Sequence, residues 1–243
     1  MSHYDYDRKI SFITIAIGDE YIEKVNILIQ SVLKFTNADI IVYTDKLESF
    51  TYAKHYYGRN LIVNDVTTLD GYVDFINGIF NYHLKAIVMY DAYAYLKSNL
   101  IYVDADTFLF GWDASMSRYI MGYEDTLLFR FRENVNENVN LINFLTPKAQ
   151  AHGVNLEDID KPLAVENIMV FTTGELTQKF LNEWKHISLF AIENNINPFI
   201  ESFELALAIK NVNMNIHNVN SRVPFVDSFR TLHQGKIIAT YII

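Results

Sequence analysis

The stretch "KISFITIAIGDEYIEKVNILIQSVLKFTNADIIVYTD", residues 9–45, decides the fold class. It begins with an apolar run that ends at Gly18-Asp19, as a buried strand would. The segment from Glu20 to Phe35 then repeats apolar residues at helical spacing. A second apolar run, Ile40 to Tyr43, follows. Strand, helix and strand at this spacing predict a βαβ unit, in which a right-handed crossover joins two parallel strands.

The same alternation continues to about residue 110. Arg59 to Val66 is predicted to be a third strand, His83 to Lys97 a helix, and the segment after Asn99 a further buried strand. This pattern predicts an α/β fold with a doubly wound, mainly parallel sheet flanked by helices on both faces. Ligands of such sheets bind outside the carboxyl ends of the strands, so the site is expected at that edge.

The second half of the chain is less regular. Its predicted strands and helices are Thr126–Phe131, Ala164–Glu175, Leu176–Ile192, Phe199–Lys210 and Met214–Val219. The polar repeat Glu133–Asn140 is interpreted as a solvated loop, with a mobile lid or acceptor loop as the alternative. Since no linker interrupts the sequence, we expect one domain over residues 1–243, with a nucleotide-binding half (1–110) and an acceptor half (111–243).

Composition excludes several classes of function. The chain has 243 residues, a net charge of −9 and no cysteine. Thiolate catalysis, disulfides and cysteine-bound zinc are therefore excluded, and nonspecific nucleic-acid binding is disfavoured. No apolar run reaches the length of a membrane span, and the polar first residues are unlike a signal peptide. These features predict a soluble, cytoplasmic protein.

The segment "NLIYVDADTFLF", Asn99 to Phe110, places two carboxylates at the end of an apolar strand. Carboxylates are rarely buried unless they are paired or bind a metal. Asp104 and Asp106 could both approach one divalent cation, directly or through its water and a bound phosphate, and carboxylate oxygens suit Mg²⁺ and Mn²⁺. Two solvated aspartates in an exposed turn are the alternative, which the apolar residues on both sides disfavour.

The segment "LHQGKI", Leu232 to Ile237, offers a second group of functional side chains. His233 could supply a neutral imidazole to the same metal. Gly235 would let the backbone approach a ligand, and Lys236 would place a positive charge near phosphates. Taken alone, this segment is more typical of a surface turn.

The chain resembles metal-dependent GT-A glycosyltransferases, and its layout is most similar to the retaining, glycogenin-like and galactosyltransferase-like family (family 8). "ITIAIGDEYI" (13–22) resembles the family's first strand and nucleotide-binding loop, and "YVDADTFLF" (102–110) resembles its Asp-x-Asp motif. "HQGK" (233–236) resembles a shortened form of the C-terminal His-x-x-Gly-x-x-Lys, a departure that puts the lysine's role in question. The likeness covers most of the chain in order, with short motifs.

The resemblance implies a GT-A type, Rossmann-like fold and a site for Mn²⁺ or Mg²⁺. Asp106 and His233 would be metal ligands, and Asp104 would contact the metal or the ribose. The remaining residues implied to bind the nucleotide-sugar are Ala16, Ile17, Gly18, Tyr21, Asp45, Lys85, Ala105, Gly235 and Lys236. Among these, Tyr21 would offer a stacking face to the base, and Lys85 would reach the donor sugar or phosphate unless it is a solvated helix lysine.

Three residues are implied to act near the reacting centre. Asn167 would contact the donor sugar, although Ile168 and Met169 replace the small residues that the family has after it. Glu201 and Glu204 lie one helical turn apart near a helix start, where the helix dipole alone would favour carboxylates. By the resemblance, Glu201 is preferred to Glu204 as the residue near the anomeric carbon or the acceptor hydroxyl; in an inverting enzyme one of them would be the general base.

The sequence therefore predicts a hexosyltransferase-like enzyme that moves a sugar from a nucleotide-sugar, a UDP-sugar by preference, to an acceptor hydroxyl, with retention. The acceptor is left open among a glycan, a protein, a lipid and a modified nucleobase, and so is assembly into a homo-oligomer. A sugar nucleotidyltransferase is one alternative, although residues 16–24 carry one glycine and no basic cluster. A non-catalytic nucleotide- or carbohydrate-binding module on the same fold is the other.

Overall fold

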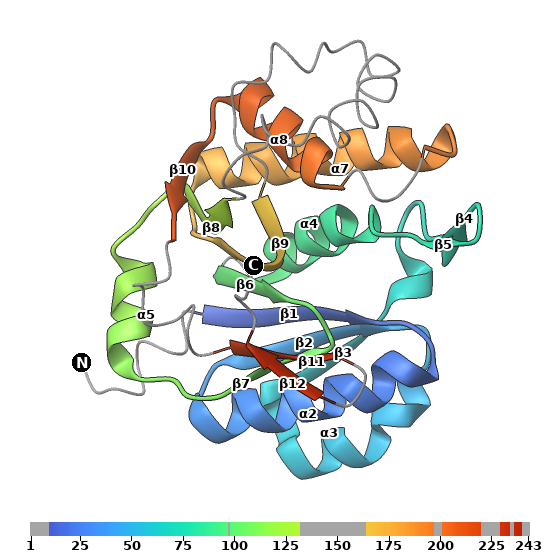
Figure 1. Cartoon of the computed structure of the whole chain (residues 1–243), viewed down its shortest axis with the longest axis vertical. Coiled ribbons are helices and arrows are strands. Elements are labelled where there is room, and N and C mark those ends of the chain that lie inside the picture. Colours follow the sequence, from blue (N-terminus) through green and yellow to red (C-terminus); the bar gives the residue numbers. More distant parts are fainter. Residues whose placement is uncertain are drawn as a thin grey trace.

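The computed structural model describes residues 10–96, 98–131, 164–196, 201–219, 229–233 and 236–239. Its centre is a seven-stranded sheet in the order β10-β8-β9-β6-β1-β2-β3 (Figure 1). Strand β9 is antiparallel to both neighbours, and the other adjacent pairs are parallel. The strands are β1 (Ile10–Ala16), β2 (Asp39–Thr44), β3 (Leu61–Asp65), β6 (Asn99–Val103), β8 (Thr126–Phe131), β9 (Ala164–Phe171) and β10 (Asn215–Asn218).

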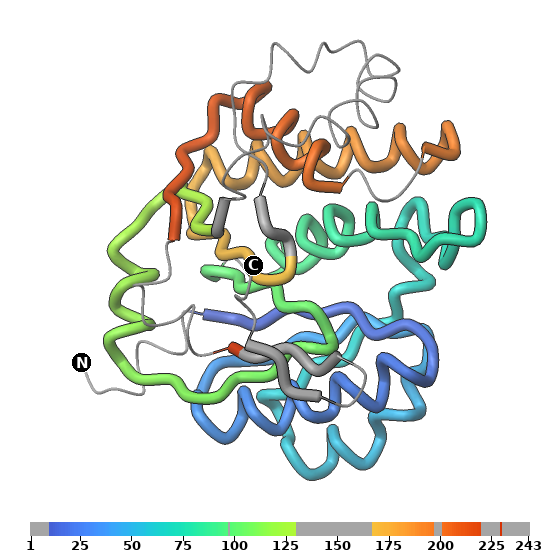
Figure 2. Tube along the Cα trace, viewed as in Figure 1, coloured from blue at the N-terminus to red at the C-terminus, as the bar shows by residue number. Residues whose placement is uncertain are grey.

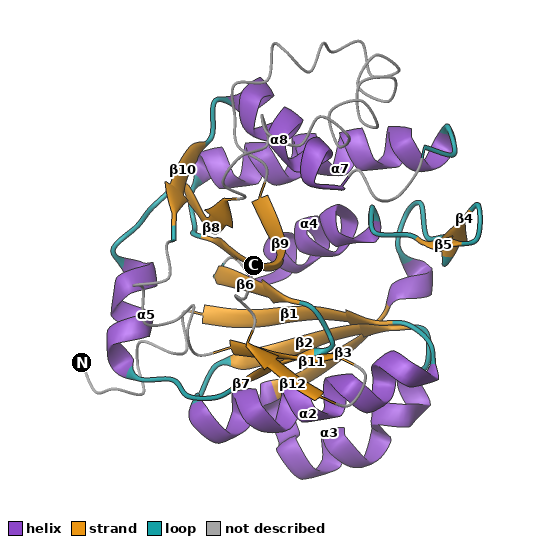
Figure 3. Cartoon of the chain, viewed as in Figure 1, coloured by secondary structure: helices purple, strands orange, loops and turns teal. Residues whose placement is uncertain are grey.

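Helices cover both faces of this sheet (Figure 3). Helices α2 and α3 lie on one face, and α4, α7 and α8 lie on the other. The α-helices are α2 (Asp19–Phe35), α3 (Thr51–Tyr57), α4 (Leu84–Leu96), α5 (Ala114–Met121), α7 (Glu175–Glu193) and α8 (Glu201–Val212). The 3₁₀ helices are η1 (Leu47–Phe50), η2 (Gly58–Asn60) and η3 (Val66–Thr68). The predicted fold class, a mixed and mainly parallel sheet flanked by helices, is confirmed.

Strand β1 shows why both faces of the sheet are closed. All seven of its residues are buried, and successive side chains alternate between the two faces. Ile13 and Ile15 join the core under α4, α7 and α8, whereas Phe12 and Ala16 join the core over α2. In Figure 2 the blue helix α2 accordingly lies on the opposite side of the sheet from the orange α7 and α8.

Two small sheets complete the fold. A hairpin of β4 (Phe75–Ile76) and β5 (Ile79–Phe80) precedes α4. In the second sheet, β11 (Phe229–His233) pairs antiparallel with both β12 (Lys236–Ala239) and β7 (Thr107–Leu109). This sheet brings the late strand β11 beside the segment that follows Asp106.

Most predicted elements are found within two residues of their expected bounds. One exception is β9, which ends at Phe171 and not at the predicted Glu175. The others are elements that the sequence did not predict, namely α3, α5, β7, β11, β12, the β4–β5 hairpin and the three 3₁₀ helices. The predicted loop at Glu133–Asn140 lies outside the described residues. Within the described part of the chain, no helix is both long enough and apolar enough to cross a membrane.

The order of the strands determines where a ligand can enter. The chain leaves β1 through α2 toward β2 on one side, and it later reaches β6 on the other side of β1 through α4. The carboxyl ends of β1 and β6 therefore lie at a reversal of strand order. Open α/β sheets bind their ligands at this kind of position.

Candidate active site

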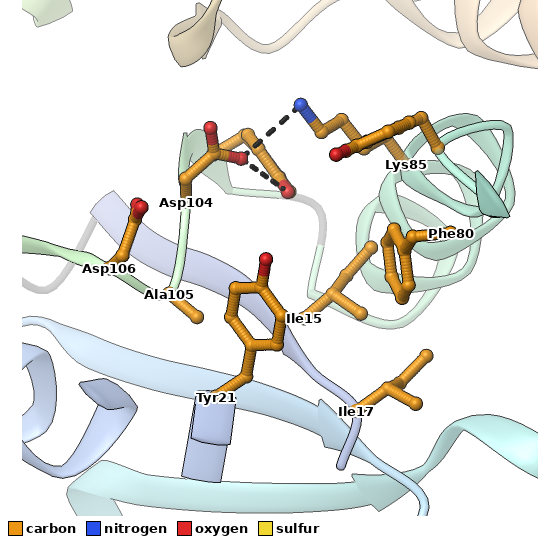
Figure 4. A pocket seen from close by; sticks show the side chains of 10 residues that line it. Ile15, Ile17, Tyr21, Phe80, Lys85, Asp104, Ala105 and Asp106 are labelled. Atoms are coloured by element: carbon orange, nitrogen blue, oxygen red, sulfur yellow. Dashed lines mark hydrogen bonds and ion pairs between the residues drawn. The ribbon is translucent and has the colours of Figure 1, made fainter. Parts of the chain in front are cut away.

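A pocket of about 130 Å³ opens where β1 and β6 end. One end is apolar and aromatic, and the other carries two carboxylates and a lysine (Figure 4). The lining residues are Ile15, Ile17, Tyr21, Phe80, Tyr82, Lys85, Tyr102, Asp104, Ala105 and Asp106. The structure thus brings together six of the predicted site residues: Ile17, Tyr21, Lys85, Asp104, Ala105 and Asp106.

Asp104 is fixed from three directions. Its Oδ1 accepts a hydrogen bond from the Tyr102 hydroxyl at 3.0 Å and lies 3.2 Å from Lys85 Nζ (Figure 4). Its backbone N–H donates to the carbonyl oxygen of Asn167 on β9, at 3.0 Å. Burial raises the pKa of Tyr102 well above its usual value, so the phenol remains protonated and can donate. Because Tyr102 and Lys85 both meet Oδ1, Oδ2 is the carboxylate oxygen of Asp104 that these two contacts leave available.

Asp106 lies on the other side of Asp104 from Lys85 (Figure 4). Burial and the neighbouring Asp104 charge raise the pKa of Asp106, and Lys24 and Lys85 only partly oppose this shift. The two carboxylates therefore hold more negative charge than their surroundings compensate. A cation between them would relieve this repulsion.

Lys85 is the central cation of the pocket. It is almost fully buried, and its Nζ lies 3.0 Å from Glu201 Oε1 as well as near Asp104. The rings of Tyr82 and Tyr102 lie 5.6 and 5.2 Å from the same nitrogen. Buried lysines need such partners. Since Glu201 begins α8, this contact ties that helix to the site.

The apolar end of the pocket is built from aromatic rings on three elements. Tyr21 on α2 and Phe80 on β5 have ring centroids 6.2 Å apart, and Tyr82 packs edge-on against Phe80 at 5.2 Å. The lining residues that sequence reasoning missed are Ile15, Phe80, Tyr82 and Tyr102. The alternation of side chains along β1 could have indicated Ile15, and the position two residues before Asp104 could have indicated Tyr102, whereas the hairpin carries no motif.

The first loop is joined to the end of β2. Gly18 has a φ of +79° and its N–H donates to Asp45 Oδ1 at 3.1 Å. Asp45 thereby shapes the loop next to the pocket, although it does not line the pocket itself. Ala16 is fully buried over α2, so the structure does not bring its side chain to the pocket.

The C-terminal motif reaches the site through β11. Thr231 pairs with Thr107, the residue that follows Asp106, and β11 continues from there to His233. The backbone of Lys236 begins β12 opposite His233. The side chains of His233 and Lys236, and the whole of Gly235, lie outside what the structure describes.

The donor atoms at this site fit a hard divalent cation. Asp104 and Asp106 supply carboxylate oxygens, and burial together with the Asp104 charge raises the pKa of Asp106. Among the described side chains, no group of three or more His, Cys, Asp or Glu residues gathers around one point. A Mn²⁺ or Mg²⁺ ion would therefore complete its coordination with water, with phosphate oxygens or with the imidazole of His233.

Glu204 does not reach the pocket. It is fully buried, with Oε1 2.9 Å from His83 Nδ1 and Oε2 accepting a hydrogen bond from Ser188 at 2.8 Å. The prediction had placed Glu201 and Glu204 on one helix face, and they do share it. Only Glu201 lies at the end of that face that meets Lys85.

The His83–Glu204 pair makes stability depend on pH. Burial lowers the pKa of His83, but the hydrogen bond and charge of Glu204, with the Ile196 carbonyl, raise it overall above the usual 6.5. A raised folded pKa stabilises the protein below the unfolded pKa, and this stabilisation is lost as pH rises through the folded pKa. We expect the difference in unfolding free energy between wild type and H83Q/E204Q to be largest below about pH 6.5 and to fall by up to about 1.4 kcal/mol per pH unit above it. Urea unfolding from pH 5.5 to 9 measures this difference, and a difference that grows with pH would contradict the assignment.

The fold resembles that of mouse xyloside xylosyltransferase 1. The two structures superpose with a TM-score of 0.52 over 87% of this chain and 85% of that chain, at 10% sequence identity. Neither a protein-family model nor a curated protein sequence matches the chain. At this identity the likeness shows a shared GT-A type fold, and it does not single out the glycogenin-like family.

Proposed function

We propose that this protein is a metal-dependent glycosyltransferase, which moves a sugar from a nucleotide-sugar to an acceptor hydroxyl. One observation carries the proposal: a single pocket at the reversal of strand order combines two carboxylates, a buried lysine and an aromatic end. The xylosyltransferase with the same fold supports the reaction class by analogy. A UDP-sugar donor and retention of configuration rest on the sequence resemblance and this analogy.

The two ends of the pocket would bind different parts of the nucleotide-sugar donor. Tyr21 would stack on the base at the aromatic end, close to Ile17 and Phe80. Oδ2 of Asp104 would accept a hydrogen bond from the ribose or approach the metal, because Oδ1 is already occupied. Lys85 would then place its positive charge beside the diphosphate or the sugar, while Glu201 holds the lysine in place.

A divalent cation bound by Asp106, with His233 as a further ligand, would neutralise the diphosphate leaving group. The protein's own contribution is to place the two carboxylates side by side and to hold Lys85 away from bulk water. Asn167 lies beside Asp104 on β9 and is proposed to contact the donor sugar. We propose a cytoplasmic location for this reaction, as the composition predicts.

Calorimetric titration with UDP in the presence and absence of Mn²⁺, followed by a UDP-release assay with a panel of nucleotide-sugars, tests this proposal. We expect Mn²⁺-dependent UDP binding and UDP release on turnover. Binding without turnover on any acceptor or water would instead indicate a non-catalytic binding module. Pyrophosphate release from a nucleoside triphosphate and a sugar phosphate would indicate a nucleotidyltransferase.

Removing the ring of Tyr21 is expected to weaken UDP binding. A base stacked on an aromatic ring contributes about 1–3 kcal/mol, so Tyr21→Ala should raise the Kd for UDP by roughly 5- to 150-fold. Tyr21→Phe keeps the ring and should bind within about threefold of wild type, which calorimetry with Mn²⁺ would show. Tyr52→Ala, which removes an exposed tyrosine on α3, is the matched control. Equal affinities for Tyr21→Ala and this control would exclude Tyr21 from the base site.

A further inference from the structure

Two parallel contacts join the start of α8 to the start of α4. Glu201 Oε1 lies 3.0 Å from Lys85 Nζ, and Glu204 Oε1 lies 2.9 Å from His83 Nδ1. The two glutamates are one helical turn apart on α8, and the two basic residues flank Leu84 at the first turn of α4. The Glu201–Lys85 contact continues to Asp104 in the pocket, whereas the Glu204–His83 contact ends in the core.

The contacts of His83 favour a charged ring. Its Nδ1 faces the Glu204 carboxyl group, and its Nε2 lies 3.2 Å from the carbonyl oxygen of Ile196. The carbonyl oxygen can only accept, and so can the Glu204 oxygen while that group is ionised, so the ring matches both when each nitrogen carries a proton. The second oxygen of Glu204 accepts from Ser188 on α7. The core between α4, α7 and α8 therefore holds an imidazolium and a carboxylate, each with hydrogen-bonding partners.

Stability alone does not account for this pair. Both side chains are fully buried, and taking two charges out of water costs several kcal/mol for each ion. A pair of apolar side chains of similar volume is often as stable or more stable. What the ionic pair adds is structural specificity, because its contacts form in one axial register of α8 against α4. That register is the one in which Glu201 meets Lys85.

We propose that His83 and Glu204 are positioning residues of the active site. Their pair sets α8 against α4, and through Glu201 it holds Lys85 in its contact with Asp104. This inference rests on the proposed function of the pocket. Neither residue lines the pocket, so their effect on catalysis passes through Glu201 and Lys85.

The double variant H83L/E204L separates positioning from stability. We expect its melting temperature to stay within a few degrees of wild type, because an apolar pair replaces a buried ionic one. Amide hydrogen exchange should become faster at residues 201–205, since the first turn of α8 is no longer fixed. We expect kcat to fall on the order of 10- to 100-fold because Lys85 is misplaced. The KM for the donor and the Kd for UDP should rise by a smaller factor than kcat falls, since Tyr21 and Asp106 are untouched.

A rescue variant and a control variant are compared with H83L/E204L. H83Q/E204Q replaces the ions with amides that can hydrogen-bond to each other, to Ile196 and to Ser188, so slow exchange at residues 201–205 and most of kcat should return. Tyr43→Phe removes a different bond of α4, the 2.6 Å hydrogen bond to Asp91, and should lower stability without changing kcat. If the leucine pair does not fold, Ser188→Ala is used instead, because it removes one hydrogen bond of Glu204 and keeps both charges. Amide exchange at residues 201–205 and kcat are then measured on this variant.

A folded H83L/E204L protein with wild-type exchange at residues 201–205 and wild-type kcat would overturn the proposal. The same result from Ser188→Ala would overturn it where the leucine pair cannot be obtained. If the wild-type protein releases no UDP from any nucleotide-sugar, the proposed function fails, and the exchange of residues 201–205 still decides whether the pair positions α8.

Discussion

The Asp106→Asn variant is expected to keep its fold and to lose Mn²⁺-dependent turnover by at least about 100-fold, the loss typical when a group that stabilises developing charge is removed. Asparagine has nearly the same volume as aspartate, so the packing at the end of β6 should survive. The substitution removes one of the two charges that could hold the cation, and it relieves the repulsion that raises the pKa of Asp106. Thermal unfolding should therefore show equal or slightly greater stability without metal, while calorimetry with Mn²⁺ and UDP shows weaker binding.

Asp70→Asn makes the same change of charge at an exposed site and serves as the control. The side chain of Asp70 is 84% exposed, lies 3.5 Å from Lys185 and does not line the pocket. It should retain wild-type UDP release and wild-type Mn²⁺ dependence. If Asp106→Asn turned over as fast as this control at every Mn²⁺ concentration, the assignment of Asp106 as a metal ligand would be wrong.

The fold was predictable where one physical signal dominated. Strand β1 is buried on both faces and α2 repeats its apolar residues at helical spacing, so the βαβ unit could be identified from local pattern alone. Helix α3 has no buried residue and the β4–β5 hairpin has two-residue strands, so neither leaves a periodic signal. Strand β7 is three residues long and depends on pairing with β11, which is more than a hundred residues away in sequence.

The site was predictable where residues lie next to each other along the chain. Asp104 and Asp106 follow β6 directly, and their position at its end required only the strand assignment. Phe80 is the last residue of the hairpin and Tyr82 lies between the hairpin and α4, and only tertiary packing brings them to Tyr21. Periodicity also placed Glu201 and Glu204 on one face of α8, but it could not tell which of them contacts Lys85. That distinction depends on which side chain of α4 lies opposite each of them.

Lys85 is the residue on which structure and catalysis depend together. Its charge is shared between Asp104, which keeps 32% of its side chain exposed, and Glu201, which keeps 13%. Removing one partner of a fully buried ion pair costs about 3–5 kcal/mol, because the other charge is left without compensation. The partial exposure of Asp104 reduces this cost, so we expect Lys85→Met to lower the unfolding free energy by about 2–4 kcal/mol.

We expect turnover to fall for a reason independent of the lost stability. In Lys85→Met no described cation replaces the ammonium beside Asp104, so we expect UDP release to fall by about 100-fold or more at temperatures where the variant is folded. Lys34→Met, at an exposed position on α2, should leave both quantities unchanged. The decisive variant is Lys85→Met with Glu201→Leu, which removes the second unpaired charge. Urea unfolding should show that it regains most of the lost stability, while the UDP-release assay shows turnover still depressed. If both returned, Lys85 would be a residue of the fold, and the positive charge that the reaction needs would have to come from another side chain.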